Sequence, residues 1–119
     1  MASSIFPAKI VWVRVGSRGD YKDRPAVVLS QPDSDGNFLV VCCTSQVGGD
    51  QDNEILLPYD PVKNAVTKFR EPVAAVLDWP ERINTKEILR IGGFVPPTYY
   101  EKIQDGVREK NLPSNLNKN

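Results

Sequence analysis

The 119-residue sequence contains no histidine, two cysteines and equal numbers of basic and acidic residues, fifteen of each. The absence of histidine excludes a histidine acid/base pair, Ser-His-Asp and Cys-His relays and the histidine-containing zinc motifs. A net charge of zero argues against nonspecific coating of nucleic acid, although it allows a local basic groove. The two cysteines, Cys42 and Cys43, are adjacent, which favours buried free thiols over a disulfide or a zinc site.

Long hydrophobic segments are also missing. No apolar run approaches the roughly 20 residues that cross a bilayer, and the first residues lack the apolar core of a secretory signal. Free thiols fit a reducing compartment. Together these features predict a cytoplasmic protein, and 40% apolar with 25% charged residues suits one globular domain.

The charges are balanced in total but unevenly placed along the chain. The segment Lys9–Arg24 has five basic and two acidic residues, whereas Gln31–Asp60 has six acidic and no basic ones. The remaining residues carry a net charge of +3. An acidic middle is therefore flanked by two basic regions, and either of these could form a local groove for an anionic partner.

Alternating and β-branched segments predict strands. Lys9–Val15 alternates between two faces, and the apolar segments Pro25–Ser30 and Phe38–Thr44 flank an Asp-Gly turn within Gln31–Asn37, as in a hairpin. Pro25 is expected at the first position of its strand, where a missing N–H is best tolerated. Further strands are expected at Glu54–Leu57, Pro72–Leu77 and Ile88–Phe94.

Polar and proline-containing segments predict the breaks between these strands. Loops with glycine are expected at Gly16–Asp23 and Ser45–Asn53. Asp78-Trp79-Pro80 is expected to end the strand that precedes it. Asn84-Thr85-Lys86-Glu87 resembles a capping box that starts one helical turn.

A C-terminal helix is expected from about Thr98 to Asn111. Thr98-Tyr99-Tyr100-Glu101 resembles a second capping box, and Tyr100, Ile103 and Val107 have the spacing of one helix face. Five to seven short strands followed by one helix most simply close into a small barrel or a strongly bent sheet with the helix on one side. We divide the chain into an arm over residues 1–8, one barrel domain over 9–112 and a polar tail over 113–119.

Three segments carry a resemblance to a known family. They are Lys9-Ile10-Val11-Trp12-Val13, Arg24-Pro25-Ala26-Val27-Val28-Leu29-Ser30 and Val41-Cys42-Cys43-Thr44-Ser45-Gln46. The chain from about Lys9 to Lys110 resembles the MazF/PemK family of toxin endoribonucleases, also called mRNA interferases. The resemblance implies a mainly β fold, a small SH3-like barrel of the CcdB/MazF type with a C-terminal α-helix, and a homodimer.

The resemblance also implies an activity. Members are toxins of toxin–antitoxin systems that cleave single-stranded mRNA at specific sequences, by attack of the 2′-hydroxyl and without a metal or cofactor. Their catalytic arginine and threonine match Arg24 and Thr44. Many are neutralised by a cognate antitoxin whose extended peptide occupies the RNA groove. In this sequence the groove would be lined by Gly16, Ser17, Arg18, Tyr21, Lys22, Ser45 and Gln46.

The chemistry of the matched positions is consistent with that activity. Arg24 offers a permanent charge and a bidentate donor fork to the phosphorane that develops during cleavage. The hydroxyl of Thr44 can bond a phosphate oxygen or fix the arginine. Without histidine the general base stays open, between Asp20, Asp23 and an arginine-assisted attack with little base catalysis.

Two other interpretations stay open at this point. The same fold could serve as a non-catalytic binding module, for an antitoxin-like peptide or for a topoisomerase as in the similar CcdB toxins. It could also be a degenerate family member retained for an interaction. Arg24 beside Asp23 would then be a solvated ion pair, and Thr44 an ordinary hydroxyl at the end of a strand.

The sequence departs from the family pattern at two places. Ala8-Lys9 stands where members usually carry Gly-Asp before the first strand, so a turn signal is lost. Gly16-Ser17-Arg18-Gly19 stands where members often carry a Gly-Ser-Glu-Gln-like loop. Since Arg18 replaces the acid, the cleavage sequence and any role of that acid do not carry over from the resemblance.

Overall fold

The described residues fold into six strands, one short 3₁₀ helix and one α-helix. A computed structural model describes residues 5–17, 20–49, 52–63 and 65–111, with the backbone alone at residues 17, 20, 21 and 111. The elements are β1 (Lys9–Ser17), β2 (Asp20–Val28), β3 (Asn37–Thr44), β4 (Glu54–Leu56), β5 (Ala74–Asn84), η1 (Thr85–Glu87), β6 (Ile88–Phe94) and α1 (Pro97–Asn111).

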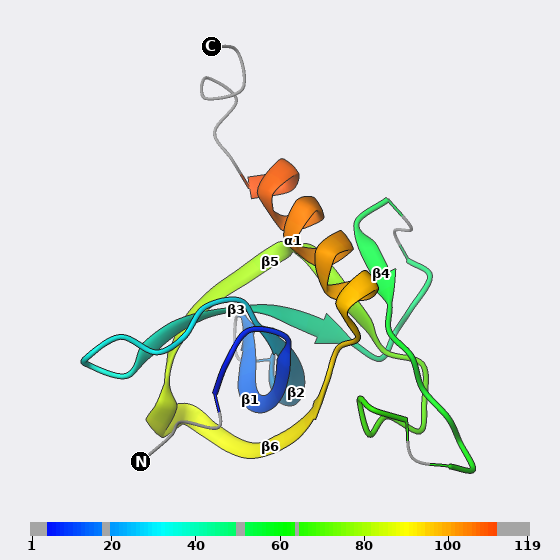
Figure 1. The fold of residues 1–119 in the computed structure, drawn as a ribbon, viewed down its shortest axis with the longest axis horizontal. Helices are drawn as coiled ribbons and strands as arrows, with labels where there is room; N and C mark the ends of the chain where they lie inside the picture. Colours follow the sequence, from blue (N-terminus) through cyan, green and yellow to red (C-terminus); the bar gives the residue numbers. More distant parts are fainter. Residues whose placement is uncertain (1–4, 18–19, 50–51, 64, 112–119) are drawn as a thin grey trace.

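The strands form one antiparallel sheet in the order β4-β5-β3-β2-β1-β6. β5 and β6 curve around the central hairpins, and α1 lies on one side of the sheet (Figure 1). The mainly β fold with a C-terminal helix is thus confirmed. The sheet remains open, since β4 and β6 form its two edges. Within the described residues, neither helix is long and apolar enough to cross a membrane.

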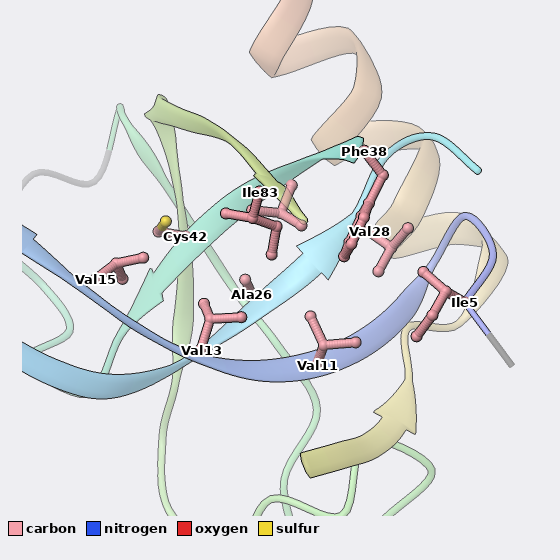
Figure 2. Packing of buried hydrophobic residues seen from close by; sticks show 10 residues of the cluster. Ile5, Val11, Val13, Val15, Ala26, Val28, Phe38, Cys42 and Ile83 are labelled. Atoms are coloured by element: carbon pink, nitrogen blue, oxygen red, sulfur yellow. The ribbon is translucent and has the colours of Figure 1, made fainter. Parts of the chain in front are cut away.

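Alternation along the strands divides the core into two clusters, one on each face of the sheet. The first cluster includes Val11, Val13, Ala26 and Cys42 (Figure 2). The second contains the strand residues that alternate with these and point to the other face. α1 covers this second cluster with the fully buried Ile103. The expected helix face is confirmed, because three further α1 side chains pack on this second cluster, namely Tyr99, Tyr100 and Val107.

The predicted loop at Gly16–Asp23 is wrong, because both strands of this hairpin continue into it. Arg14 pairs with Asp23 across the ladder, and the pairing continues to Ser17 opposite Asp20. The cross-strand ladder and the ion pair between Arg14 and Asp23 stabilise this polar part of the hairpin. Its residues lack the alternating hydrophobic pattern from which a strand is predicted.

The predicted position of Pro25 is wrong for the same reason. Pro25 lies inside β2, opposite Trp12, and not at its start. β3 pairs with β2 only from Ala26 onward. One side of β2 therefore has no ladder partner at Pro25, which is where a strand tolerates a residue without an N–H.

The predicted turn between β2 and β3 is confirmed. The carboxylate of Asp33 accepts hydrogen bonds from the backbone N–H groups of Asp35 and Asn37, at 2.9 and 3.0 Å. Gly36 has a φ of 87°, in the region that favours glycine. The strands on both sides then pair antiparallel, with Val28 opposite Val40.

The expected strand end at Asp78-Trp79-Pro80 is wrong. β5 runs through these residues to Asn84. Val41 of β3 faces Pro80, whereas Cys43 faces Ala75, so β5 has additional residues at a bulge between these two points. The bulge lets a proline-containing segment stay in the sheet, and it places Trp79 against the first cluster.

One capping box is confirmed and the other is wrong. The side chain of Asn84 accepts from the N–H of Lys86, and the side chain of Glu87 accepts from the N–H of Asn84, as predicted for the short helix η1. The α-helix, in contrast, begins at Pro97, so Thr98 lies within its first turn. Proline suits this first helical position because its missing N–H has no partner there. The predicted tail over 113–119 lies outside the described residues.

Ala8 keeps the backbone of the turn whose usual glycine it replaces. Its φ is 78°, in the left-handed region. Its N–H donates to the carbonyl of Val28 at 2.9 Å, and its carbonyl accepts from the N–H of Val95 at 2.8 Å. These two bonds, at the ends of β2 and β6, hold a conformation that disfavours an L-residue by about 1–2 kcal/mol.

Candidate functional site

Arg24 lies at the end of the first cluster. It pairs with Val13 across the β1–β2 ladder and therefore shares a face with Ala26, two residues further along β2. Figure 2 shows Val15 and Cys42 at this end of the cluster, away from Ile5. The Arg24 guanidinium carbon lies 5.3 Å from the centre of the Trp79 ring, as in a cation–π contact. Its Nε atom is buried and has no hydrogen-bond partner among the residues that the structure describes.

Thr44 ends β3 on the same face. Ala26 pairs with Cys42 at the end of the β2–β3 ladder, so Arg24 and Thr44 each lie two residues beyond that pair, on the same face. The Thr44 hydroxyl accepts a hydrogen bond from the backbone N–H of Gln46 at 3.0 Å. This bond uses a lone pair of the oxygen and leaves the O–H free to donate. The fold therefore brings together the two residues that the sequence pairs as catalytic candidates.

A pocket of about 380 Å³ lies beside the same strand ends. Five of the candidate residues that the sequence names for the site line it, namely Lys22, Asp23, Arg24, Ser45 and Gln46. Its other walls come from one face of β1, β2 and β3 and from the segment before β5, and are Trp12, Pro25, Cys43, Glu71 and Val73.

Arg24 lines the pocket, but its guanidinium lies over a residue of the other face. Trp12, Cys43 and Val73 of the pocket wall belong to the second cluster. Trp79, over which the guanidinium lies, packs against the first. Arg24, within β2, is therefore in contact with both faces of the sheet. We take the guanidinium surroundings as the candidate reaction site and the pocket as an adjoining binding surface, because the charged group decides the chemistry.

The two candidate bases, Asp23 and Asp20, differ in what the structure describes of their side chains. The Asp23 carboxylate accepts from Arg14 Nε at 2.9 Å, and alternation puts it on the face opposite the Arg24 side chain. Both partners of this ion pair are more than half exposed, with side-chain exposures of 66% and 52%. Asp20 lies in β2, but its side chain is outside the described part of the chain.

The remaining predicted groove residues lie in the outer part of the β1–β2 hairpin. Gly16 is half-buried and pairs with Tyr21. Ser17 pairs with Asp20. The side chains of Ser17 and Tyr21, and the whole of Arg18, lie outside the described residues.

The two thiols lie on opposite faces and are both free and buried, as the sequence predicts. Burial raises the pKa of Cys42 to about 12, and the Glu81 carboxylate adds to this rise while Arg24 opposes it. Burial also raises the pKa of Cys43, and the neighbouring Cys42 adds to that rise. Neither thiol is therefore a nucleophile near neutral pH, because nucleophilic attack needs the thiolate.

Trp79 and Glu81 were not predicted from the sequence as site residues. The Trp79 indole N–H donates to Glu81 Oε2 at 3.1 Å. The signal was the alternation of Trp79, Glu81 and Ile83, which continues a strand face beyond the expected break. It was hidden because Pro80 and the β5 bulge interrupt the ordinary pattern.

A second aromatic group lies on the other face. The Arg90 guanidinium carbon is 4.3 Å from the centre of the Trp12 ring, and Phe69 meets that ring edge-on at 6.4 Å. Trp12 also lines the adjoining pocket. The structure thus has two arginine–tryptophan contacts, one on each face of the hairpin.

The sequence matches a family model over residues 7–110, described as a PemK-like, MazF-like toxin of the type II toxin–antitoxin system. The chain therefore belongs to this family. A comparison with curated proteins finds no match.

Solved structures of MazF proteins share the fold. The Mycobacterium tuberculosis toxin MazF-mt6 is 17% identical, with a TM-score of 0.65 over 86% of this chain and 94% of that one. A MazE–MazF structure from Deinococcus radiodurans is 16% identical, with a TM-score of 0.68 over 90% and 96%. A mycobacterial endoribonuclease in complex with its cognate antitoxin is 17% identical, with a TM-score of 0.64 over 91% and 96%. At these identities the likeness concerns the fold alone.

Proposed function

We propose that this family member is a sequence-specific endoribonuclease that cleaves single-stranded mRNA by attack of a 2′-hydroxyl on the neighbouring phosphate. Two observations carry the proposal. Arg24 and Thr44 lie on one face, each two residues beyond the paired Ala26 and Cys42, and the buried Arg24 Nε has no partner among the described residues. A buried donor without a partner is unfavourable by about 1–3 kcal/mol. A phosphate oxygen in the complex would satisfy it.

Arg24 stabilises the charge that develops on the phosphorane. The Trp79 contact holds its guanidinium on one side, so the charge needs little reorganisation when the phosphate arrives. Thr44 donates its free O–H to a phosphate oxygen, while its bond to the Gln46 N–H fixes the loop that follows β3. A rigid pair of strands thus presents a cation and a hydroxyl to one phosphate.

The adjoining pocket holds the nucleotides next to the cleaved bond. Lys22 supplies a positive charge, and Ser45 and Gln46 supply donors and acceptors that can contact base edges. The extended segment of an antitoxin would occupy the same pocket, as the toxin–antitoxin complexes of the structural relatives suggest. We further propose that the protein acts as a cytoplasmic homodimer.

The test compares wild type with Arg24→Ala on long single-stranded RNA in metal-free buffer. We expect wild type to yield fragments with a 2′,3′-cyclic phosphate at short defined sequences, and Arg24→Ala to lose at least about 100-fold in rate. Arg82→Ala is the matched control, because Arg82 is exposed on β5 and its 3.5 Å contact is with Asp33, away from the site. Equal, negligible cleavage by wild type and Arg24→Ala would overturn the proposal.

A further inference from the structure

Resting on the proposed function, we infer that Glu81 is the general base that takes the proton of the attacking 2′-hydroxyl. It fills the role that the absence of histidine leaves open. Glu81 lies on β5, and β3 separates this strand from β2, which carries the two candidates suggested by the sequence, Asp20 and Asp23.

The position of Glu81 is fixed by the residue that also holds Arg24. Trp79 has the Arg24 guanidinium over its ring and donates its indole N–H to Glu81 Oε2 at 3.1 Å. The Trp79 indole therefore orients both groups: the Arg24 guanidinium lies over its ring, and the Glu81 carboxylate is bonded to the N–H at its edge. Among the described side chains Glu81 forms no ion pair with Arg24, so its carboxylate is not held against the guanidinium.

The strand pairing puts this carboxylate on the required face. Glu81 pairs with Val40 of β3, which belongs to the first cluster with Cys42 and Ala26. Thr44, at the end of β3, and Arg24, within β2, continue the same face. Glu81 is half-buried, and its Oε1 has no hydrogen bond within the described part of the chain. One carboxylate oxygen is thus held by Trp79, and the other is left to accept a proton.

The competing carboxylates are directed elsewhere. Asp23 is bonded to Arg14 on the opposite face. Glu71 lines the pocket with residues of the second cluster, among them Val73. Glu81, in contrast, shares its electrostatic surroundings with Arg24, because both charges act on the Cys42 thiol that lies between their strands.

The step balances without a co-reactant other than water. The 2′-hydroxyl proton passes to the Glu81 carboxylate as the 2′-oxygen forms its bond to phosphorus. The bond from phosphorus to the 5′-oxygen then breaks, and the departing oxygen takes a proton from solvent. The products are a 2′,3′-cyclic phosphate and a 5′-hydroxyl, and Glu81 returns its proton to water.

Glu81 should give the cleavage rate an acid limb, that is, a fall in rate as pH decreases and the carboxylate becomes protonated. The ionisable groups facing it are Arg24 from β2 and Cys42 from β3, while β1 contributes the apolar Val15 at this end. Cys42, with a pKa raised to about 12, stays neutral throughout the acid range.

The experiment measures single-turnover cleavage of an RNA containing one cut site, from pH 4 to pH 8, with wild type, Glu81→Gln, Glu81→Asp and Trp79→Phe. We expect Glu81→Gln to lose about 100-fold or more at neutral pH and to lose the acid limb. Glu81→Asp should recover part of the rate and regain the limb. Trp79→Phe removes the N–H that orients the carboxylate and should cost a smaller factor, about tenfold.

Glu101→Gln is the matched control, because Glu101 is exposed on α1. It should retain the wild-type rate and profile. Thermal unfolding of each variant tests whether it is folded, and the pair Glu81→Gln and Glu81→Asp separates a proton acceptor from a structural contact. If Glu81→Gln keeps the acid limb, the inference is wrong while the proposed function stands. If wild type cleaves no RNA, the proposed function itself fails.

Discussion

Arg14 and Arg24 belong to the same β-hairpin but lie on opposite faces of the sheet, and their surroundings differ accordingly. Arg14 is mostly exposed and bonded to Asp23 at 2.9 Å. Arg24 is half-buried, lies over Trp79 and has an Nε atom without a partner in the described part of the chain. This difference shows that a positive charge alone does not identify a functional residue. The arginine that the fold leaves unsatisfied is the one available to a ligand.

The largest expected effect comes from Arg24→Lys. Lysine keeps the charge but lacks the planar fork that lies over an indole and reaches two phosphate oxygens. We expect the RNA cleavage rate to fall about 100-fold. Arg14→Lys, the matched change on the other face, should alter the rate less than about threefold, since its surface ion pair contributes little. Similar losses in both variants would contradict the difference between the two arginines.

The next effect concerns the two thiols, one on each face. The pKa values of Cys42 and Cys43 are raised in the folded protein, so the folded state holds their protons more tightly than the unfolded state does. Their contribution is fully present below the unfolded pKa of about 9 and decreases as pH rises toward about 12.

In that window each thiol should lower the free energy of unfolding by about 1.4 kcal/mol per pH unit. Urea unfolding at pH 8, 9.5 and 10.5 measures this slope. The variants Cys42→Ala and Cys43→Ala should each reduce it by about one proton. An unchanged slope in both would show that burial does not hold the thiols neutral.

Thr44→Val tests the role of the Thr44 hydroxyl, which lies on the same face as Arg24. Valine keeps the shape of the side chain but removes both the O–H and the acceptor for the Gln46 N–H. We expect about a tenfold loss in cleavage rate and a loss of about 1 kcal/mol in stability. Thr44→Ser should restore most of the rate. A Thr44→Ser variant as slow as Thr44→Val would argue against a role for the hydroxyl.

The smallest expected effect comes from Asp23→Asn on the opposite face. The exposed pair with Arg14 should contribute only about 0.2–1 kcal/mol, and less at high salt. The pH–rate profile of this variant should keep its acid limb, because its carboxylate faces away from the Arg24 side chain. Chemical unfolding at low and high salt, with the pH–rate profile, checks both points; a lost limb would identify Asp23 as the base instead.

Most of the fold was predictable because local signals agreed with it. Alternation, the Asp-Gly turn and the Asn84 capping box predicted β1, the β2–β3 hairpin and η1. The failures have a common cause. The outer β1–β2 ribbon and the second half of β5 are held by cross-strand pairing, an ion pair and a bulge, so their residues need no hydrophobic pattern.

The chemistry of the site could be predicted from the sequence, but the side chains that surround Arg24 could not. The sequence by itself indicated that no histidine takes part, that Arg24 and Thr44 belong to two adjoining strands, and that the two thiols are buried. The tertiary structure showed that Arg24 lies within β2, that Asp23 turns to the opposite face, that Trp79 lies against Arg24 and that Glu81 is bonded to Trp79. The physical reason is strand register. The ladders between β2, β3 and β5 join residues from distant parts of the chain, and a bulge in β5 sets which face each side chain takes.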